Sequence, residues 1–110
     1  MEEVASGDWS KFFGQRLGAA RGRGELSRDM LIDLLKRQNY RCALSGVPLT
    51  CLLQKGTVTK TNASIDRINP KGGYVLENVQ LVCAVINKFR VDLPVNEFVS
   101  WCRKVADYAV

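Results

Sequence analysis

The run Asn69-Pro70-Lys71-Gly72-Gly73 constrains the fold more than any other feature of this 110-residue sequence. It combines asparagine, proline and glycine, the residue types that favour tight turns. Residues 63–68 before it are compatible with a strand, and Tyr74-Val75 resumes an extended conformation after it. Apolar residues then recur at helical spacing over about 77–90. The sequence therefore predicts a strand, a glycine-rich turn, a short strand and a helix in consecutive order.

Helices are expected on both sides of this unit. The spacing of apolar residues predicts helices over about 9–20, 28–38 and 95–108, and Ser27 is a candidate N-cap for the second of them. We expect the last helix to bury Phe98, Trp101 or Cys102, and Val105. Residues 42–49 resemble a short extended segment with a turn at Ser45-Gly46, and residues 51–61 resemble a polar loop or an irregular hairpin. The result is an α+β fold in a single domain spanning 1–110.

The charge distribution favours an anionic partner. The net charge is +5, and no acidic residue lies between Leu34 and Ile65 or between Trp9 and Gly24. Solvated surfaces usually mix both signs, so such stretches favour contact with phosphate groups. We therefore divide the chain into a basic N-terminal helix or arm at 1–26 and a core at 27–108. The basic side chains that we expect to contact DNA in these stretches are Arg16, Arg21, Arg23, Lys36 and Arg37.

The cysteines and the apolar residues exclude other classes of protein. The chain has four cysteines and no histidine, and none of the cysteines forms a CxxC pair. We expect reduced, mostly buried thiols and no zinc site, because all four thiols would have to converge to form one. No apolar run is long enough to span a bilayer, and the acidic N-terminus does not resemble a secretory signal. We therefore expect a cytoplasmic protein without a membrane partner.

Three polar residues of the strand–turn–strand–helix unit could carry chemistry. Asp66 lies on the predicted first strand, Asn78 opens the predicted helix and Asn87 lies near its end. Nine residues of helix separate the two amides by roughly 13.5 Å, so they cannot bind the same ion. Asn87 can approach Asp66 only if the hairpin folds back along the helix. That arrangement would give two oxygen ligands to a hard cation such as Mg²⁺ and leave the other positions to water and phosphate.

Four blocks of the sequence resemble the HNH-like endonucleases common in bacteriophage genomes, over about residues 27–108. The blocks are Cys42-Ala43-Leu44-Ser45-Gly46-Val47-Pro48-Leu49, Ala63-Ser64-Ile65-Asp66-Arg67-Ile68, Gly73-Tyr74-Val75-Leu76-Glu77-Asn78-Val79-Gln80-Leu81-Val82 and Ile86-Asn87-Lys88. They occur in the order and with the spacing found in the family. The resemblance implies a ββα-metal core with flanking helices, and metal-dependent hydrolysis of DNA phosphodiester bonds in the cytoplasm of a host cell.

The resemblance also implies roles for individual residues. Asp66 and Asn87 would bind the catalytic Mg²⁺ or Mn²⁺, and Asn78 would brace the hairpin against the helix through backbone hydrogen bonds. Lys88 and Arg90 would lie near the scissile or flanking phosphates. Lys71, in the predicted turn, is a further expected DNA contact.

One position departs from the family pattern. A histidine usually follows the metal-binding acid and activates water, and Arg67 stands there instead; its guanidinium is a poor base but can hold a phosphate oxygen. Some relatives carry a histidine near the position of Cys83. The remaining candidate bases are Tyr74, Lys71, Cys83 and a metal-bound hydroxide. Asp66 on its own could also simply cap the turn or pair with Arg67.

The missing histidine leaves three functions open. The first is an active endonuclease or nickase from a phage or mobile element, which could act as a homodimer to cut both strands. The second is a DNA-binding module that has lost catalysis. The third is a small phage effector that binds a host protein.

Overall fold

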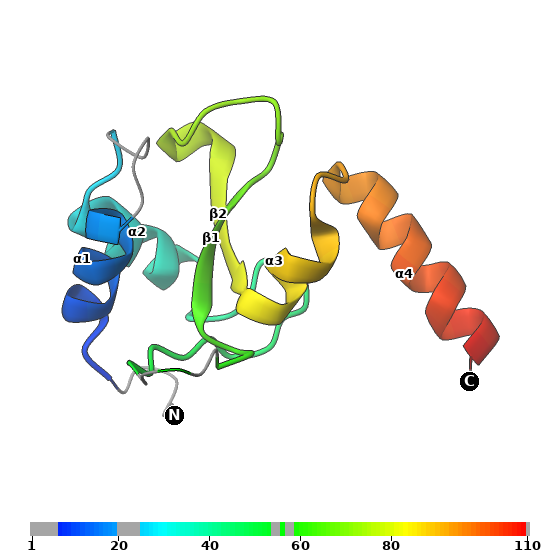
Figure 1. Cartoon of the computed structure of the whole chain (residues 1–110), viewed down its shortest axis with the longest axis horizontal. Helices are drawn as coiled ribbons and strands as arrows, with labels where there is room; N and C mark the ends of the chain where they lie inside the picture. Colours follow the sequence, from blue (N-terminus) through cyan, green and yellow to red (C-terminus); the bar gives the residue numbers. More distant parts are fainter. Residues whose placement is uncertain (1–6, 20–24, 54–55, 57–58, 110) are drawn as a thin grey trace.

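The structure, a computed structural model, describes residues 7–19, 25–53, 56 and 59–109. The described part of the chain has a mixed α+β fold with a two-stranded antiparallel sheet (Figure 1). Its elements are α1 (Trp9–Ala19), α2 (Arg28–Arg37), β1 (Ala63–Arg67), the 3₁₀ turn η2 (Leu76–Asn78), β2 (Val79–Cys83), α3 (Ala84–Arg90) and α4 (Val95–Ala109).

The strands β1 and β2 form a hairpin, and this corrects the helix predicted over 77–90. Ala63 pairs with Cys83 and Arg67 pairs with Val79, so the strand continues to residue 83 and helix α3 begins only at Ala84. The spacing of the apolar residues at 79, 82 and 86 is compatible with a single helix and also with a strand that is followed by a helix. Pairing with β1 decides between the two, because it satisfies the backbone hydrogen bonds of a segment rich in residues that favour strands.

The hydrophobic core lies between the hairpin and the first two helices. In Figure 1, α1 and α2 flank the hairpin on one side and α3 on the other; α2 packs on β2, and α3 packs on both strands. The aromatic residues of α1, namely Trp9, Phe12 and Phe13, belong to the same buried cluster as Leu81 and Val82 of β2. The α1 aromatics are therefore core residues.

The first two predicted helices are confirmed. α1 and α2 end within one residue of the predicted bounds. The Ser27 side chain accepts a hydrogen bond of 3.2 Å from the backbone N–H of Met30 and so caps α2. Leu31 and Leu35 are the buried residues of this helix. Local capping and spacing are therefore sufficient to define the N-terminal part of the fold.

The C-terminal helix differs from the prediction in its packing. α4 covers the expected residues but projects away from the hairpin (Figure 1), and Phe98 is its buried residue among those that the structure describes. Trp101, Cys102 and Val105 are exposed, so the expectation that they are buried is wrong. Periodicity shows that a helix has an apolar face, but it does not show whether the chain itself supplies a surface to cover that face.

The structure also places the cysteines and tests for membrane-spanning segments. All four cysteines are free thiols; Cys42, Cys51 and Cys83 are buried and Cys102 is exposed, as expected for reduced and mostly buried residues. Within the described ranges, no helix has the length and apolar character needed to cross a membrane.

Candidate metal-binding site

Four of the predicted site residues line one small pocket between the hairpin and α3. The pocket has a volume of about 160 Å³. Its lining residues are Ile65, Asp66, Arg67, Pro70, Tyr74, Asn87 and Val91. The packing of α3 on both strands thus provides the arrangement in which Asp66 and Asn87 reach the same space. Asn78 does not line this pocket.

Asp66 forms a buried ion pair with Arg90, which corrects the prediction that Arg90 contacts DNA. Only 4% of Asp66 and 1% of Arg90 are exposed, and Arg90 Nη1 donates to Asp66 Oδ2. The same guanidinium donates to three backbone carbonyls, those of Arg67 (2.7 Å), Ile68 (2.8 Å) and Leu93 (2.7 Å). These acceptors compensate the loss of hydration of the buried cation. Arg90 therefore joins β1, α3 and the segment before α4 and has no surface to offer a phosphate.

Gln80 supplies a second donor to the same carboxylate oxygen. It lies opposite Asp66 in the hairpin register, and its Nε2 donates to Asp66 Oδ2 at 2.9 Å. Among the described residues, no donor reaches the other oxygen, Oδ1. The two donors therefore fix the orientation of the carboxylate and leave Oδ1 without a hydrogen bond from any described residue.

Asn87 is held by a serine of the first strand. Its Nδ2 donates to Ser64 Oγ at 2.7 Å. Ser64 and Asp66 lie two residues apart on β1 and so face the same side of the hairpin, the side on which α3 packs. Because the amide nitrogen is bound to Ser64, the amide oxygen of Asn87 is directed away from Ser64.

Arg67 and Tyr74 contact each other at the rim of the pocket. The Arg67 guanidinium lies 4.9 Å from the centre of the Tyr74 ring, and its Nη1 donates to the carbonyl of Gly72 at 3.1 Å. Arg67 is thus held beside Asp66 without forming an ion pair with it. A cation in this position can bind a phosphate oxygen.

Asn78 closes the turn of the hairpin, which corrects both its predicted position and the contact it was expected to make. It ends the 3₁₀ turn before β2 and does not open a helix. Its side chain accepts from the N–H of Asn69 (3.0 Å) and donates to the carbonyls of Asn69 (3.1 Å) and Gly73 (2.9 Å). Asn78 therefore braces the two arms of the hairpin loop against each other and not against α3.

The other predicted DNA contacts are divided between the two sides of the molecule. Lys71 in the turn and Lys88 on α3 are exposed. The exposed residues Lys36 and Arg37 lie on α2, where Arg37 forms an ion pair of 2.9 Å with Asp33. The guanidinium of Arg16 lies 4.5 Å from the ring centre of Phe12 on α1. α1 and α2 lie across the hairpin from α3 (Figure 1), whereas Asn87 of α3 lines the pocket. The remaining predictions, Arg21 and Arg23, lie outside the described residues.

Cys83 is poorly suited to act as a base. It is buried and does not line the pocket. Its burial raises the pKa of its thiol, and the nearby Cys42 thiol raises that pKa further. Its backbone N–H donates to Cys42 Sγ at 3.3 Å, and the N–H of Ser45 donates to the same sulfur at 3.3 Å. Burial alone would raise the pKa of Cys42, but these and other hydrogen bonds outweigh it and lower that pKa. The Cys42 thiol therefore joins the segment after α2 to the end of β2.

Ser64 and Gln80 are the site residues that the sequence analysis missed. Gln80 could have been found from the hairpin register, but only if Val79–Cys83 had been assigned to a strand. Ser64 could have been found from its position two residues before Asp66 on the same strand face. In the described part of the chain, no group of three or more cysteine, aspartate or glutamate side chains could hold a metal. A cation in the pocket would therefore bind Asp66, the amide oxygen of Asn87, water and substrate.

Comparisons with protein-family models, with curated proteins and with solved structures find no match to this chain.

Proposed function

We propose that this chain is a metal-dependent DNA endonuclease or nickase of the ββα-metal, HNH-like class. The observation that carries the proposal is the pocket shared by Asp66 and Asn87, formed where a β-hairpin packs on the helix that directly follows it. In this class a strand acid and a helix amide would hold one hard cation between them. The basic net charge of +5 supports an anionic substrate.

The donor set of the pocket fits Mg²⁺ or Mn²⁺. A carboxylate oxygen and an amide oxygen are hard ligands, and a site with few protein ligands suits a cation that retains several waters. Gln80 and Arg90 both occupy Asp66 Oδ2, so Oδ1 is the oxygen that remains for the cation. When bound, the cation would stabilise negative charge on the phosphate and on the leaving oxygen.

The residues around the cation would bind and orient the phosphate. Arg67 lines the pocket, with its guanidinium positioned by Gly72 and Tyr74, and can hold a non-bridging phosphate oxygen. Exposed Lys71 and Lys88 lie on the turn and on α3 and can contact flanking phosphates. Tyr74, which lines the pocket beside Arg67, is the candidate proton acceptor.

A DNA-binding module without catalysis is the second candidate. The chain has no histidine, and a positioned base typically contributes about a hundred- to ten-thousand-fold to the rate. The buried ion pair supports this candidate as well, because Arg90 already neutralises Asp66. In that case Asp66 would stabilise the fold and the pocket would bind phosphate without hydrolysing it.

Nicking of supercoiled plasmid distinguishes the two candidates. The protein is incubated with plasmid and Mg²⁺ or Mn²⁺, with and without a chelator, beside Asn87→Ala and the matched control Asn96→Ala on α4. We expect metal-dependent nicking that Asn87→Ala abolishes and Asn96→Ala retains. Ser64→Ala removes only the hydrogen bond that orients Asn87, so it should lower activity or metal affinity by about 10- to 100-fold.

The alternatives give different results in the same assay. Salt-sensitive DNA binding without cleavage in any metal would support the module without catalysis. The absence of both cleavage and DNA binding would overturn both candidates. Circular dichroism of each variant shows whether a loss of activity reflects a loss of fold.

A further inference from the structure

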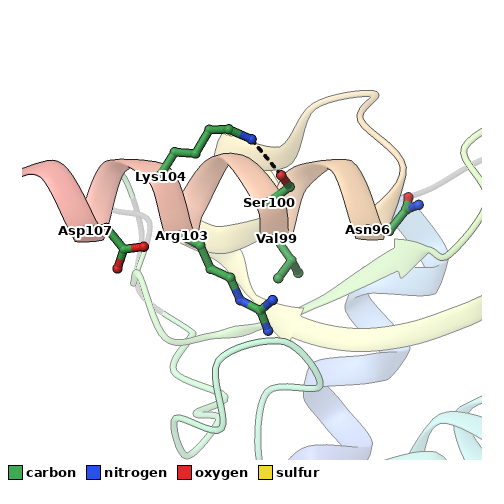
Figure 2. Close-up of a pocket in the computed structure, with 6 residues that line it drawn as sticks. All are labelled: Asn96, Val99, Ser100, Arg103, Lys104 and Asp107. Atoms are coloured by element: carbon green, nitrogen blue, oxygen red, sulfur yellow. Dashed lines mark hydrogen bonds between the residues drawn. The ribbon is translucent and has the colours of Figure 1, made fainter.

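Within the described part of the chain, three hollows follow one another from the metal pocket to the side of α4. The first is the pocket of about 160 Å³ that Asp66 and Asn87 share. A second hollow, of about 610 Å³, lies beside it, because Pro70 lines both. A third, of about 470 Å³, runs along α4 (Figure 2), and Asn96 lines both the second and the third. We name the whole row the α4 groove, its second member the middle hollow and its third member the α4 hollow.

One face of the helix lines the α4 hollow. The lining residues recur at intervals of three and four positions, as expected for one side of a helix. They are Asn96, Val99, Ser100, Arg103, Lys104 and Asp107. Figure 2 shows the Arg103 side chain extending away from the helix axis, whereas the Lys104 Nζ donates to Ser100 Oγ at 3.0 Å. Both bases of α4 therefore lie on the face that borders the groove.

Arg103 has no partner in the part of the chain that the structure describes. It forms no hydrogen bond or ion pair there, although Asp107 lies four residues further along the same face. Arg103 and Lys104 are both exposed. A guanidinium presents a planar fork of donors that matches two oxygens of a phosphate. The far end of the groove therefore offers donors that can bind an anion.

The middle hollow differs in character from the two ends of the groove. The apolar residues that line it are Ile68, Pro70, Pro94 and Val95. An apolar wall suits a deoxyribose or the face of a base, whereas the carboxylate of Asp92 in the same hollow repels a phosphate. The groove thus has anion-binding ends and a mainly apolar middle. A nucleic-acid strand has the same alternation, because a sugar and a base lie between successive phosphates.

We propose that the α4 groove binds the DNA strand that continues from the metal pocket, with phosphates on Arg103 and Lys104. The inference rests on the proposed function, because it extends the path of the same substrate beyond the metal. Asn96 and Arg103 are seven residues apart, which is roughly 10.5 Å along the helix and about three steps of a B-DNA strand. Asn96 itself is only the wall between two hollows, since its side-chain oxygen accepts from the N–H of Glu97 at 2.9 Å.

The charges along the groove favour a polyanion. Among the described residues, the bases that line the three hollows are Arg67, Lys71, Arg103 and Lys104. The acids that line them are Asp66, Asp92 and Asp107. Asp66 is already neutralised by its ion pair with Arg90. The bases therefore exceed the unpaired acids, so the groove attracts phosphate groups.

The salt dependence of DNA binding tests the proposal separately from catalysis. Binding of a labelled DNA duplex is followed by fluorescence anisotropy in the presence of a chelator, over a range of salt concentrations. The slope of log affinity against log salt becomes shallower by about one for each phosphate contact that is lost. We expect a change of about one in Arg103→Ala and in Lys104→Ala, and of about two when they are combined. Arg28→Ala removes the same charge from the exposed surface of α2 and should keep the wild-type slope.

Cross-linking identifies the side of α4 that faces the DNA. A photoactivatable group is attached through the thiol to Cys102 of the wild type, or to the new thiol of Ser100→Cys in a chain that also carries Cys102→Ser. The two positions lie roughly 160° apart around the helix. Ser100 lines the α4 hollow and Cys102 does not, so DNA should be linked from position 100 and much less from position 102. Circular dichroism checks that each variant keeps the helix content of the wild type.

The possible results separate the α4 groove from the nuclease proposal. A protein that nicks plasmid, and whose double variant Arg103→Ala with Lys104→Ala keeps the wild-type salt slope, would overturn the groove and leave the nuclease proposal in place. The expected change of slope without nicking in any metal would support the groove and overturn the nuclease. Cross-links that are as strong from position 102 as from position 100 would also overturn the groove.

Discussion

Replacing Arg90 by methionine should destabilise the protein severely. Arg90 is almost fully buried, forms an ion pair with Asp66 and donates to three backbone carbonyls. Methionine keeps much of the apolar volume but removes the charge and every donor. The substitution leaves the Asp66 carboxylate buried without its cation, and breaking a buried pair in this way costs about 3–5 kcal/mol.

This loss is large beside the total stability. A chain of this length is expected to have a free energy of unfolding of about 5–15 kcal/mol. Arg90→Met should therefore lower the urea midpoint strongly and lower the Tm by more than about 10 °C. Arg90→Lys keeps the charge but not the fork of donors, so it should lose less than Arg90→Met. A loss of less than about 1 kcal/mol in Arg90→Met would refute the reasoning.

A double-mutant cycle separates the ion pair from the other contacts of Arg90. In Asp66→Asn combined with Arg90→Met, neither an unpaired anion nor an unpaired cation is left buried. We expect this variant to be destabilised by clearly less than the sum of the two single variants, with a coupling of at least about 1 kcal/mol. Additive losses would show that the carbonyl contacts of Arg90, and not its pairing with Asp66, hold the site together.

Three further predictions concern the turn, the thiols and a buried amide. Gly72→Ala should destabilise the chain, because its Cβ would lie 2.6 Å from Asn78 Nδ2, whereas Gly73→Ala meets nothing within 4 Å; denaturant unfolding of both variants checks the difference. Cys102 is the exposed thiol, so about one thiol per native chain should react rapidly with a thiol reagent, and the other three should react only on unfolding; fast labelling of a second thiol contradicts this. Asn62→Ala should lower the free energy of unfolding by about 2–4 kcal/mol, because the buried amide forms hydrogen bonds of 2.9 Å and 2.7 Å with the backbone of Leu52. Unchanged thermal unfolding of this variant would show that these bonds contribute little to stability.

The sequence by itself determined the elements whose signals are local. The Asn69–Gly73 run forms the predicted turn after the first strand, although the second strand lies at Val79–Cys83 and not at Tyr74-Val75 as predicted. Ser27 caps α2 through a contact with a residue three positions away. Spacing over a few turns was sufficient to define α1 and the extent of α4. The same local patterns placed Asp66 on a strand and Asn87 on the following helix. Turns, caps and short periodic segments depend on interactions between residues that are close in the sequence, so the sequence alone can predict them.

Tertiary structure decided the features that depend on distant partners. Val79–Cys83 is a strand because Ala63–Arg67 pairs with it, although its spacing also fits a helix. Arg90 is buried because hydrogen-bond acceptors on β1 and in the segment before α4 surround its guanidinium. The sequence around residue 90 does not predict these acceptors. Trp101, Val105 and Tyr108 of α4 are exposed because no part of the described chain covers them. The residue type indicates which hydrogen bonds and ion pairs a side chain can form. Only the fold brings the partners close enough, and a polar side chain can be buried only where such partners are present.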